Sequence, residues 1–199
     1  VFAIKRPPLP RHFMIVTGEY GLRKQIEKNI PAFYPLRSGY TTGACATAAA
    51  KAALTALILG EEQKMISFRL PDDEEMTLPV AHTEIEKNSA TCTVVKDAGD
   101  DPDVTHGASI VVTVSFSNHP DIRFLQGEGV GRVTLPGLGL EIGEPAINRI
   151  PRQMIMKELS ALYDKGLDVT ISVPGGKELA QRTFNPKLGI VDGNSILGT

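Results

Sequence analysis

The chain has 199 residues, of which 42% are apolar and 22% charged, a composition that excludes a disordered chain and suffices for one globular domain with a buried core. Its two cysteines, Cys45 and Cys92, lie far apart and form no Cys-x-x-Cys pair, which supports neither a disulfide framework nor a zinc site. We therefore predict reduced thiols in a cytoplasmic protein.

The net charge is −2, but residues 1–36 carry +4 and the remainder −6. The basic residues of 1–36 form no clustered run, so we predict a solvated flank and no nucleic-acid partner. The most apolar stretch, Ala44–Leu59, is interrupted by Lys51 and is shorter than the roughly 20 residues that span a bilayer. No membrane association is predicted.

The first elements in chain order are an extension and a helix. Residues 1–36 are rich in proline and are predicted to be an N-terminal extension with one short helix near Leu22–Asn29. Ala44–Leu59 is predicted to be a tightly packed helix, because it consists almost entirely of small or apolar residues and hydroxyl groups precede it. Gly60 is expected to end this helix.

After Gly60, alternating apolar and polar residues predict strands. A second helix is expected from Pro151 to about Asp164, then a strand, Asp168–Val173, and a short helix, Lys177–Arg182. Several strands precede the second helix, so we predict an α+β (mixed α/β) fold with a mixed sheet and packed helices. The early predicted strands are Met65–Leu70, Met76–Val80, Ala90–Lys96, Ser109–Phe116, Ile122–Gln126 and Gly131–Leu135.

Two segments in the first half could carry chemistry. Ser38–Gly43 precedes the first helix, where free amides and hydroxyls could hold a carboxylate or phosphate, although ordinary helix capping explains the same residues. Asp97–Gly107 holds four carboxylates and a histidine, which suggests acid/base chemistry or a surface turn. Its spacing does not fit a calcium loop, and one histidine makes no transition-metal site.

Two segments in the second half are also candidates. Gly127–Gly131 has the spacing Gly-x-Gly-x-Gly and precedes an extended stretch, so the dinucleotide fingerprint is not met. Its glycines favour tight turns or a close approach of backbone to a flat ligand. Gly143–Arg152 places Asn148, Arg149 and Arg152 around a helix start, which suits carboxylate recognition but also fits a capped helix with solvated arginines.

Taken together and in order, these segments resemble the CbiD family of anaerobic cobalamin biosynthesis. The resemblance implies that residues 37–199 form a CbiD-like domain, the first domain of a longer enzyme whose Rossmann-like C-terminal part is missing here. A chain truncated at that end would be inactive alone if the missing part completes the cofactor site. The resemblance rests on Arg37–Ala46, Lys96–Gly107, Gly127–Gly131, Gly143–Arg152, Thr183–Ile190 and Ser195–Thr199.

The implied activity is transfer of a methyl group from S-adenosylmethionine to C1 of cobalt-precorrin-5B, a cobalt-containing tetrapyrrole, which gives cobalt-precorrin-6A. The cobalt would arrive chelated in the substrate, so the resemblance implies no metal bound by protein side chains. Asp97, Asp100 and His106 are the candidates for acid/base or orienting roles. The candidate substrate-binding residues are Arg37, Thr41, Thr42, Gly43, Arg132, Asn148, Arg149 and Arg152, and the candidate cofactor-binding residues are Gly127, Gly129, Gly131, Ser195, Gly198 and Thr199.

Two other classes of function stay open. A hydroxyl-rich loop before a small-residue helix is similar to the phosphate loop of GHMP-type small-molecule kinases, but the run of glycines and serines that would wrap a triphosphate is missing. A non-catalytic binding domain for an acidic ligand is the second alternative. The oligomeric state is open, and a homo-oligomer is compatible with the sequence.

Overall fold

Helix α2 (Thr42–Leu59) forms the centre of the fold in the computed structural model, which describes residues 37–198. The Thr41 side chain caps its first turn by accepting a hydrogen bond from the Ala44 amide at 3.1 Å. At the other end Gly60 adopts a left-handed conformation, with φ 72°, and its amide donates to the Ala56 carbonyl at 2.8 Å. The predicted helix, its cap and its end are confirmed.

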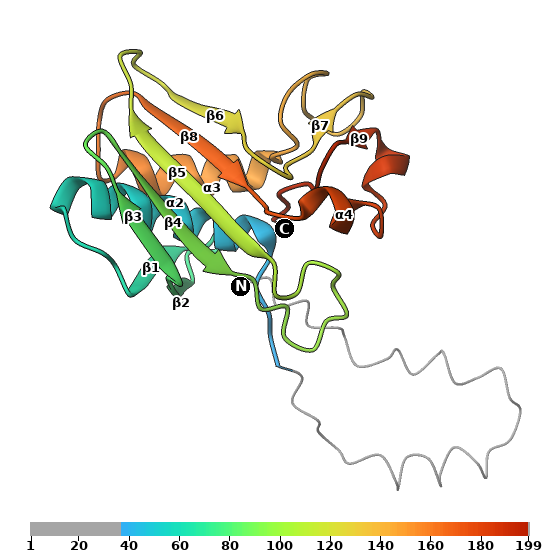
Figure 1. Ribbon diagram of the computed structural model, residues 1–199, viewed down its shortest axis with the longest axis horizontal. Coiled ribbons are helices and arrows are strands. Elements are labelled where there is room, and N and C mark those ends of the chain that lie inside the picture. Colours follow the sequence, from blue (N-terminus) through green and yellow to red (C-terminus); the bar gives the residue numbers. More distant parts are fainter. Residues whose placement is uncertain (1–36, 199) are drawn as a thin grey trace, which may run out of the picture.

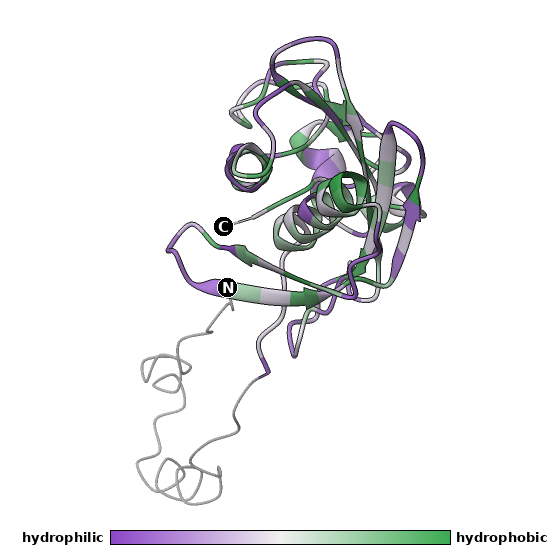
Figure 2. Cartoon of the chain, turned by 90° about the vertical axis from the view of Figure 1, so that its left-hand side faces the viewer, coloured by the Kyte–Doolittle hydropathy of each residue, from purple (hydrophilic) through white to green (hydrophobic). Residues whose placement is uncertain are grey.

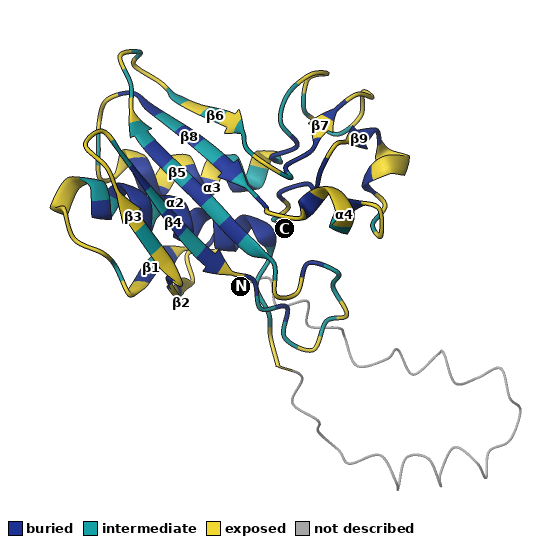
Figure 3. Ribbon diagram, viewed as in Figure 1, coloured by how far each residue is buried: buried dark blue, intermediate teal, exposed yellow. Residues whose placement is uncertain are grey.

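Alanine dominates α2, and this composition brings neighbouring elements close to the helix. Ten buried apolar residues lie along it; nine are alanine or cysteine, the tenth is Leu54, and each has at most 4% of its surface exposed. Among the described helices α2 is long and apolar enough to cross a membrane, but 72% of it is buried within the domain. We therefore assign α2 as the core helix of the domain; most of it is dark blue, the colour of buried residues, in Figure 3.

A five-stranded sheet covers α2, and helix α3 (Arg149–Ser160) packs beside it (Figure 1). The strand order is β3-β4-β5-β8-β6; neighbours are antiparallel except β6 and β8, which are parallel. The parallel pair requires a crossover, and α3 lies in that connection. The predicted mixed sheet is confirmed, with strands β3 (His82–Ile85), β4 (Ser89–Val95), β5 (Ser109–Phe116), β6 (Ile122–Gln126) and β8 (Leu167–Ser172).

The register places one apolar row of the sheet against the helices. Cys92 pairs with Val112, and Val112 pairs in turn with Ile171; all three are fully buried. The opposite face carries hydroxyl side chains, for example Thr113 opposite Thr170. This alternation is the period-2 pattern of a sheet with one packed face.

Two small two-stranded sheets complete the domain. The hairpin β1 (Met65–Arg69) and β2 (Glu75–Pro79) contacts α2, so that hairpin and sheet enclose the helix from two sides (Figure 2). Strands β7 (Arg132–Val133) and β9 (Ile190–Val191) pair at the far end beside helix α4 (Gly176–Ala180) and the 3₁₀ helix η2 (Asn185–Leu188).

Some predicted boundaries were wrong for local reasons. The second helix begins at Arg149 and ends at Ser160, because Ala161–Asp164 turn out of the helix and leave Leu162 41% exposed. Strand β3 escaped prediction because three of its four residues are exposed at the sheet edge. Where Gly131–Leu135 was expected as a strand, only β7 forms. The extension 1–36, with its expected helix, lies outside the described residues.

Candidate functional site

Residues 37–40 run alongside the loop 97–100, which joins the first two sequence motifs. The Tyr40 amide donates to the Asp97 carbonyl at 2.7 Å, and the Asp100 amide donates to the Arg37 carbonyl at 3.0 Å. In return the Arg37 amide donates to Asp100 Oδ2 at 2.6 Å. A Cβ atom on Gly39 would overlap the backbone of Ala98, so the two segments lie this close only with glycine there.

Asp97 is held in an ion pair rather than left free for proton transfer. The Arg37 guanidinium donates to both of its carboxylate oxygens, with Nη2 to Oδ1 at 2.9 Å. Together with the Gly99 amide, Arg37 lowers the pKa of Asp97 to about 2. His106, another of the three candidates on this loop, accepts a hydrogen bond at Nδ1 from the Ala98 amide at 3.1 Å. Both side chains therefore fix the shape of the loop.

The C-terminal motif docks on the N-terminus of α2. The Gly43 amide donates to the Leu197 carbonyl at 2.6 Å, and Thr42 Oγ1 accepts from the Leu197 amide at 2.8 Å. The amides of Ala44 and Cys45 donate to the side chain and carbonyl of Thr41. The donors that the sequence offered to an anion at Gly43 and the following two residues are thus already used by the protein.

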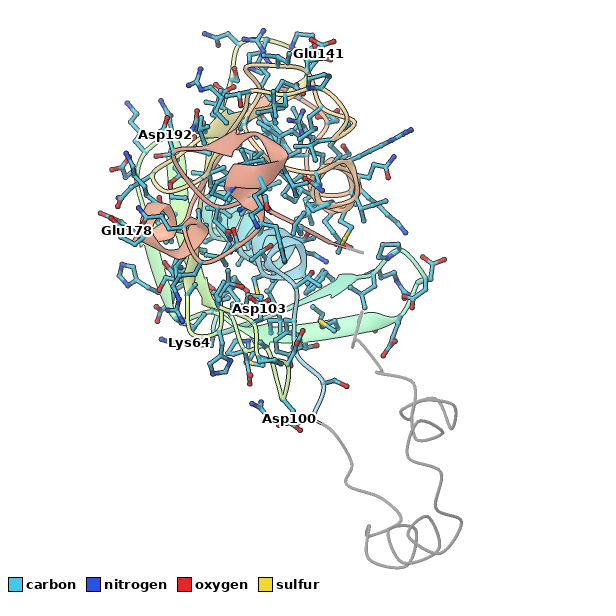
Figure 4. All side chains as sticks on the ribbon, turned by 90° about the vertical axis from the view of Figure 1, so that its right-hand side faces the viewer. Lys64, Asp100, Asp103, Glu141, Glu178 and Asp192 are labelled. Atoms are coloured by element: carbon cyan, nitrogen blue, oxygen red, sulfur yellow. The ribbon has the colours of Figure 1, made fainter. Side chains whose placement is uncertain are left out.

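A cavity of about 530 Å³ opens where these segments meet. Its wall consists of residues 37–42 at the start of α2, of the loop after β4, and of the segment that contains η2 and the C-terminal motif. In Figure 4 the loop places Asp103 close to the body of the domain and Asp100 at its outer edge. Of the predicted site residues, those that line the cavity are Arg37, Thr41, Thr42, Asp100, Ser195 and Gly198.

Lys96 supplies a buried positive charge to this cavity. Its side chain is only 2% exposed, and Nζ donates to Asp103 Oδ2 at 2.7 Å. Asp103 Oδ1 accepts from the amide and the hydroxyl of Thr105 at 2.8 and 2.7 Å. Burial alone would raise the pKa of Asp103, but the hydrogen bonds from Lys96 and Thr105 outweigh it and lower the pKa below its usual value.

Buried amide and hydroxyl groups also line the cavity. Asn185 Nδ2 donates to Asn194 Oδ1 at 2.9 Å, and Ser195 Oγ donates to Asn185 Oδ1 at 3.0 Å. All three residues are at most 5% exposed. Apolar side chains stand beside them: Phe184 is 73% exposed, and Leu188 is 49% exposed. The cavity therefore combines a buried polar interior with an exposed apolar border.

The glycines of the predicted cofactor site pack closely against other parts of the chain. A Cβ atom on Gly127 or Gly129 would overlap the end of β8 and the residue after it, at Ser172 and Val173. On Gly131 it would overlap Ile190. These glycines serve close packing of the backbone against the chain, and none of them lines the cavity.

The arginines of the second half also lie away from the cavity. Arg152 donates to the carbonyls of Ile147 and Pro145 at 2.8 and 3.2 Å and to Glu144 Oε1 at 3.1 Å. These three hydrogen bonds attach the loop before α3 to the helix. Arg132 donates to Gln126, and Arg149 is exposed.

Asn148 precedes α3, and its side chain makes no cap hydrogen bond. Its amide donates to the Ile196 carbonyl at 3.0 Å. The remaining predicted cofactor residue, Thr199, lies outside the described residues.

Sequence reasoning passed over Lys96 and the two asparagines as site residues. Lys96 could have been found from the sequence, because it continues the inward-facing row of Ala90, Cys92 and Val94 at a spacing of two. A lysine is almost never fully buried unless it is paired, so a lysine in such a row marks a candidate site residue. No comparable pattern marks Asn185 and Asn194, because η2 and the stretch before Ser195 have no regular period.

Fold and cavity define an α+β domain with a mixed sheet over a central alanine-rich helix and a cavity at the N-terminus of that helix. The CbiD family model matches residues 31–199, and the chain belongs to the CbiD family. The resemblance found in the sequence is confirmed.

Curated relatives carry the name cobalt-precorrin-5B C(1)-methyltransferase. The protein of Geobacillus kaustophilus is 56% identical over 82% of this chain and 45% of its own length. That of Rubrobacter xylanophilus is 48% identical over 98% of this chain and 48% of its own length. The chain therefore spans about half the length of the curated relatives it matches.

A solved structure has the same fold. The crystal structure of the cobalamin biosynthesis protein CbiD from Archaeoglobus fulgidus is 33% identical, with a TM-score of 0.62, over 82% of this chain and 53% of that one.

Proposed function

We propose that this chain takes part in the S-adenosylmethionine-dependent methylation of C1 of cobalt-precorrin-5B, which gives cobalt-precorrin-6A, and that its cavity contributes to the ligand site. The observation that carries the proposal is the position of the cavity: the motif segments before α2, after β4 and at the C-terminus converge on it. Membership of the CbiD family and the names of the relatives support the reaction. We further propose that the reaction takes place in the cytoplasm.

The size of the cavity suits one small ligand or one edge of a larger one. Ligand pockets typically measure about 300–1,000 Å³, and the cavity lies in the lower half of that range. S-adenosylmethionine fits this size, and its polar groups match the amides of Asn185 and Asn194 and the ammonium of Lys96. A tetrapyrrole macrocycle would instead rest on the exposed apolar border that includes Phe184 and Leu188.

The residues of this chain would bind and orient the reactants, because methyl transfer needs no covalent nucleophile from the protein. When bound, S-adenosylmethionine supplies the methyl group as an electrophilic carbon on its sulfonium. Of the three candidate acid/base residues, Asp100 is the one that lines the cavity. Its Oδ2 accepts from the Arg37 amide, which fixes the orientation of the carboxylate. We propose Asp100 as the residue that accepts or holds a proton near the reacting carbon.

A methyl-transfer assay tests the proposal. The protein that carries these 199 residues is incubated with cobalt-precorrin-5B and methyl-labelled S-adenosylmethionine, and the tetrapyrrole is analysed by mass spectrometry. We expect one added methyl group. We also expect Asp100→Asn to lower kcat by about 10²- to 10⁴-fold, whereas Asp164→Asn, which changes an exposed carboxylate away from the cavity, leaves kcat unchanged.

Different results test the proposed reaction and the assignment of Asp100. If the unaltered protein transfers no methyl group, the proposed reaction is wrong. If transfer occurs and Asp100→Asn turns over like Asp164→Asn, the reaction stands and the assignment of Asp100 is wrong.

A further inference from the structure

Lys96 is unusual among the charged residues of this domain. It directly follows β4 and continues the buried row of Cys92 and Val94 toward α2. Its side chain is 2% exposed, whereas the Lys51 side chain, also paired within the domain, is 22% exposed. Removing an ammonium from water is costly, so a lysine stays buried only where polar partners compensate.

The ammonium of Lys96 has more hydrogen-bond donors than its one protein partner, Asp103, accepts. A lysine ammonium has three N–H donors. Among residues 37–198, Nζ of Lys96 donates a single hydrogen bond, to Asp103 Oδ2. By contrast, Nζ of Lys51 contacts both the Ser67 carbonyl and Glu158 Oε2, each at 2.7 Å. Because Lys96 lines the cavity, its remaining donors are available to an occupant of the cavity.

Asp103 holds the ammonium in one position. Its Oδ1 is already bound by the amide and hydroxyl of Thr105, so Oδ2 is fixed where it meets Lys96. The carboxylate also balances the buried charge when the cavity is empty. An occupant with its own carboxylate would add charge-assisted hydrogen bonds to Nζ, which are about twice as strong as bonds between neutral groups.

We propose that Lys96 is the carboxylate anchor of the cavity and that Asp103 is its positioning residue. This inference rests on the proposed function and deepens it, because it names the group that the cavity recognises. Both reactants carry such a group. The methyl donor has the carboxylate of its methionine part, and the tetrapyrrole has acetate and propionate arms.

A purely structural role for the Lys96–Asp103 pair predicts a different outcome. In that case the pair would tie the loop after β4 to the sheet, and its removal would weaken all ligands alike. Selectivity for a carboxylate is a readout that such a role would not change. Lys51→Met is the matched control, because it removes another paired, largely buried lysine that does not line the cavity.

The experiment measures dissociation constants by calorimetry for two ligand pairs on the protein that carries these 199 residues. The first pair is S-adenosylhomocysteine and its decarboxylated analogue; the second is cobyrinic acid and its methyl ester. We expect the unaltered protein to prefer the carboxylate form of one pair by roughly 10- to 100-fold. Lys96→Met should remove most of that preference, Asp103→Asn should reduce it, and Lys96→Arg should keep part of it. The affected pair identifies the source of the carboxylate.

The control variant and the unaltered protein distinguish a failure of the anchor from a failure of the ligand site. Lys51→Met should keep the full preference. If Lys96→Met also keeps the preference for the carboxylate form, or if Lys51→Met loses as much of that preference as Lys96→Met, Lys96 is not the carboxylate anchor. Ligand binding in the cavity would still stand in that case. If the unaltered protein binds neither pair, the proposed ligand site fails along with the anchor.

Discussion

Replacement of Thr42 by valine tests how the C-terminal motif is attached to α2. Thr42 is 6% exposed, and its hydroxyl both accepts from the Leu197 amide at 2.8 Å and donates to the Leu197 carbonyl at 3.2 Å. Valine keeps the volume and removes both hydrogen bonds. The Gly43 amide would still hold the Leu197 carbonyl, so the segment should loosen rather than detach.

The expected magnitude follows from the partners that are lost. A buried donor left unsatisfied costs about 1–3 kcal/mol. Because Leu197 is 48% exposed and water can reach part of it, we expect about 1–2 kcal/mol for Thr42→Val. That free energy corresponds to roughly 5- to 30-fold faster local opening.

Hydrogen exchange at the Leu197 amide, together with urea unfolding, measures this effect. Thr42→Ser keeps the hydroxyl and is the matched control: it should lose stability from one methyl group, about 0.8 kcal/mol, with little change in exchange at Leu197. If Thr42→Val leaves both the exchange at Leu197 and the unfolding midpoint unchanged, the hydroxyl does not hold the segment and the description of this wall of the cavity is wrong.

Three further predictions concern the loop and the core. Gly39→Ala should destabilise the domain by about 1–3 kcal/mol through overlap with Ala98, more than Gly60→Ala, which meets open space and strains only a left-handed residue; equal urea midpoints for the two variants would contradict this. The pKa of Asp97 is lowered by Arg37, so its stabilisation is complete above the unfolded value near 3.9 and is lost as the pH falls through about 2. The stability difference between the unaltered protein and Asp97→Asn should thus be constant above about pH 5 and shrink below it in urea titrations, and a constant difference down to pH 2 would refute the ion pair. Burial raises the pKa of the Cys45 thiol to about 12, so iodoacetamide at pH 8 should modify Cys45 only after unfolding, as mass spectrometry would show; rapid modification of the folded protein would contradict its burial.

Local chemistry made much of the fold predictable. The alanine-rich run from Ala44, the hydroxyl of Thr41 and the glycine at 60 are short-range signals that define one helix without reference to the rest of the chain. The alternating strands β4, β5 and β8 were equally clear because one face of each is buried. The edge strand β3 has no such contrast between faces, so its sequence carries little period.

The site was less predictable because its geometry depends on contacts between distant segments. The amides at the start of α2 looked free in the sequence, and only the fold brings Leu197 onto Gly43. Similarly, the glycines of Gly127–Gly131 suggested a ligand, but in the fold they pack against the end of β8 and the chain that follows it. The family resemblance drew attention to six segments, and only the fold shows that side chains from four of them share one cavity.

Hydrogen–deuterium exchange of the protein that carries these 199 residues, with and without S-adenosylhomocysteine and cobyrinic acid, tests the central claim most directly. The central claim is that ligands bind in the cavity at the N-terminus of α2. We predict slower exchange in the segments 37–42, 96–105 and 183–198, which contribute the residues that line it, and unchanged exchange in residues 127–131. Protection of residues 127–131 with none around the cavity would contradict it and return the ligand site to the glycine segment.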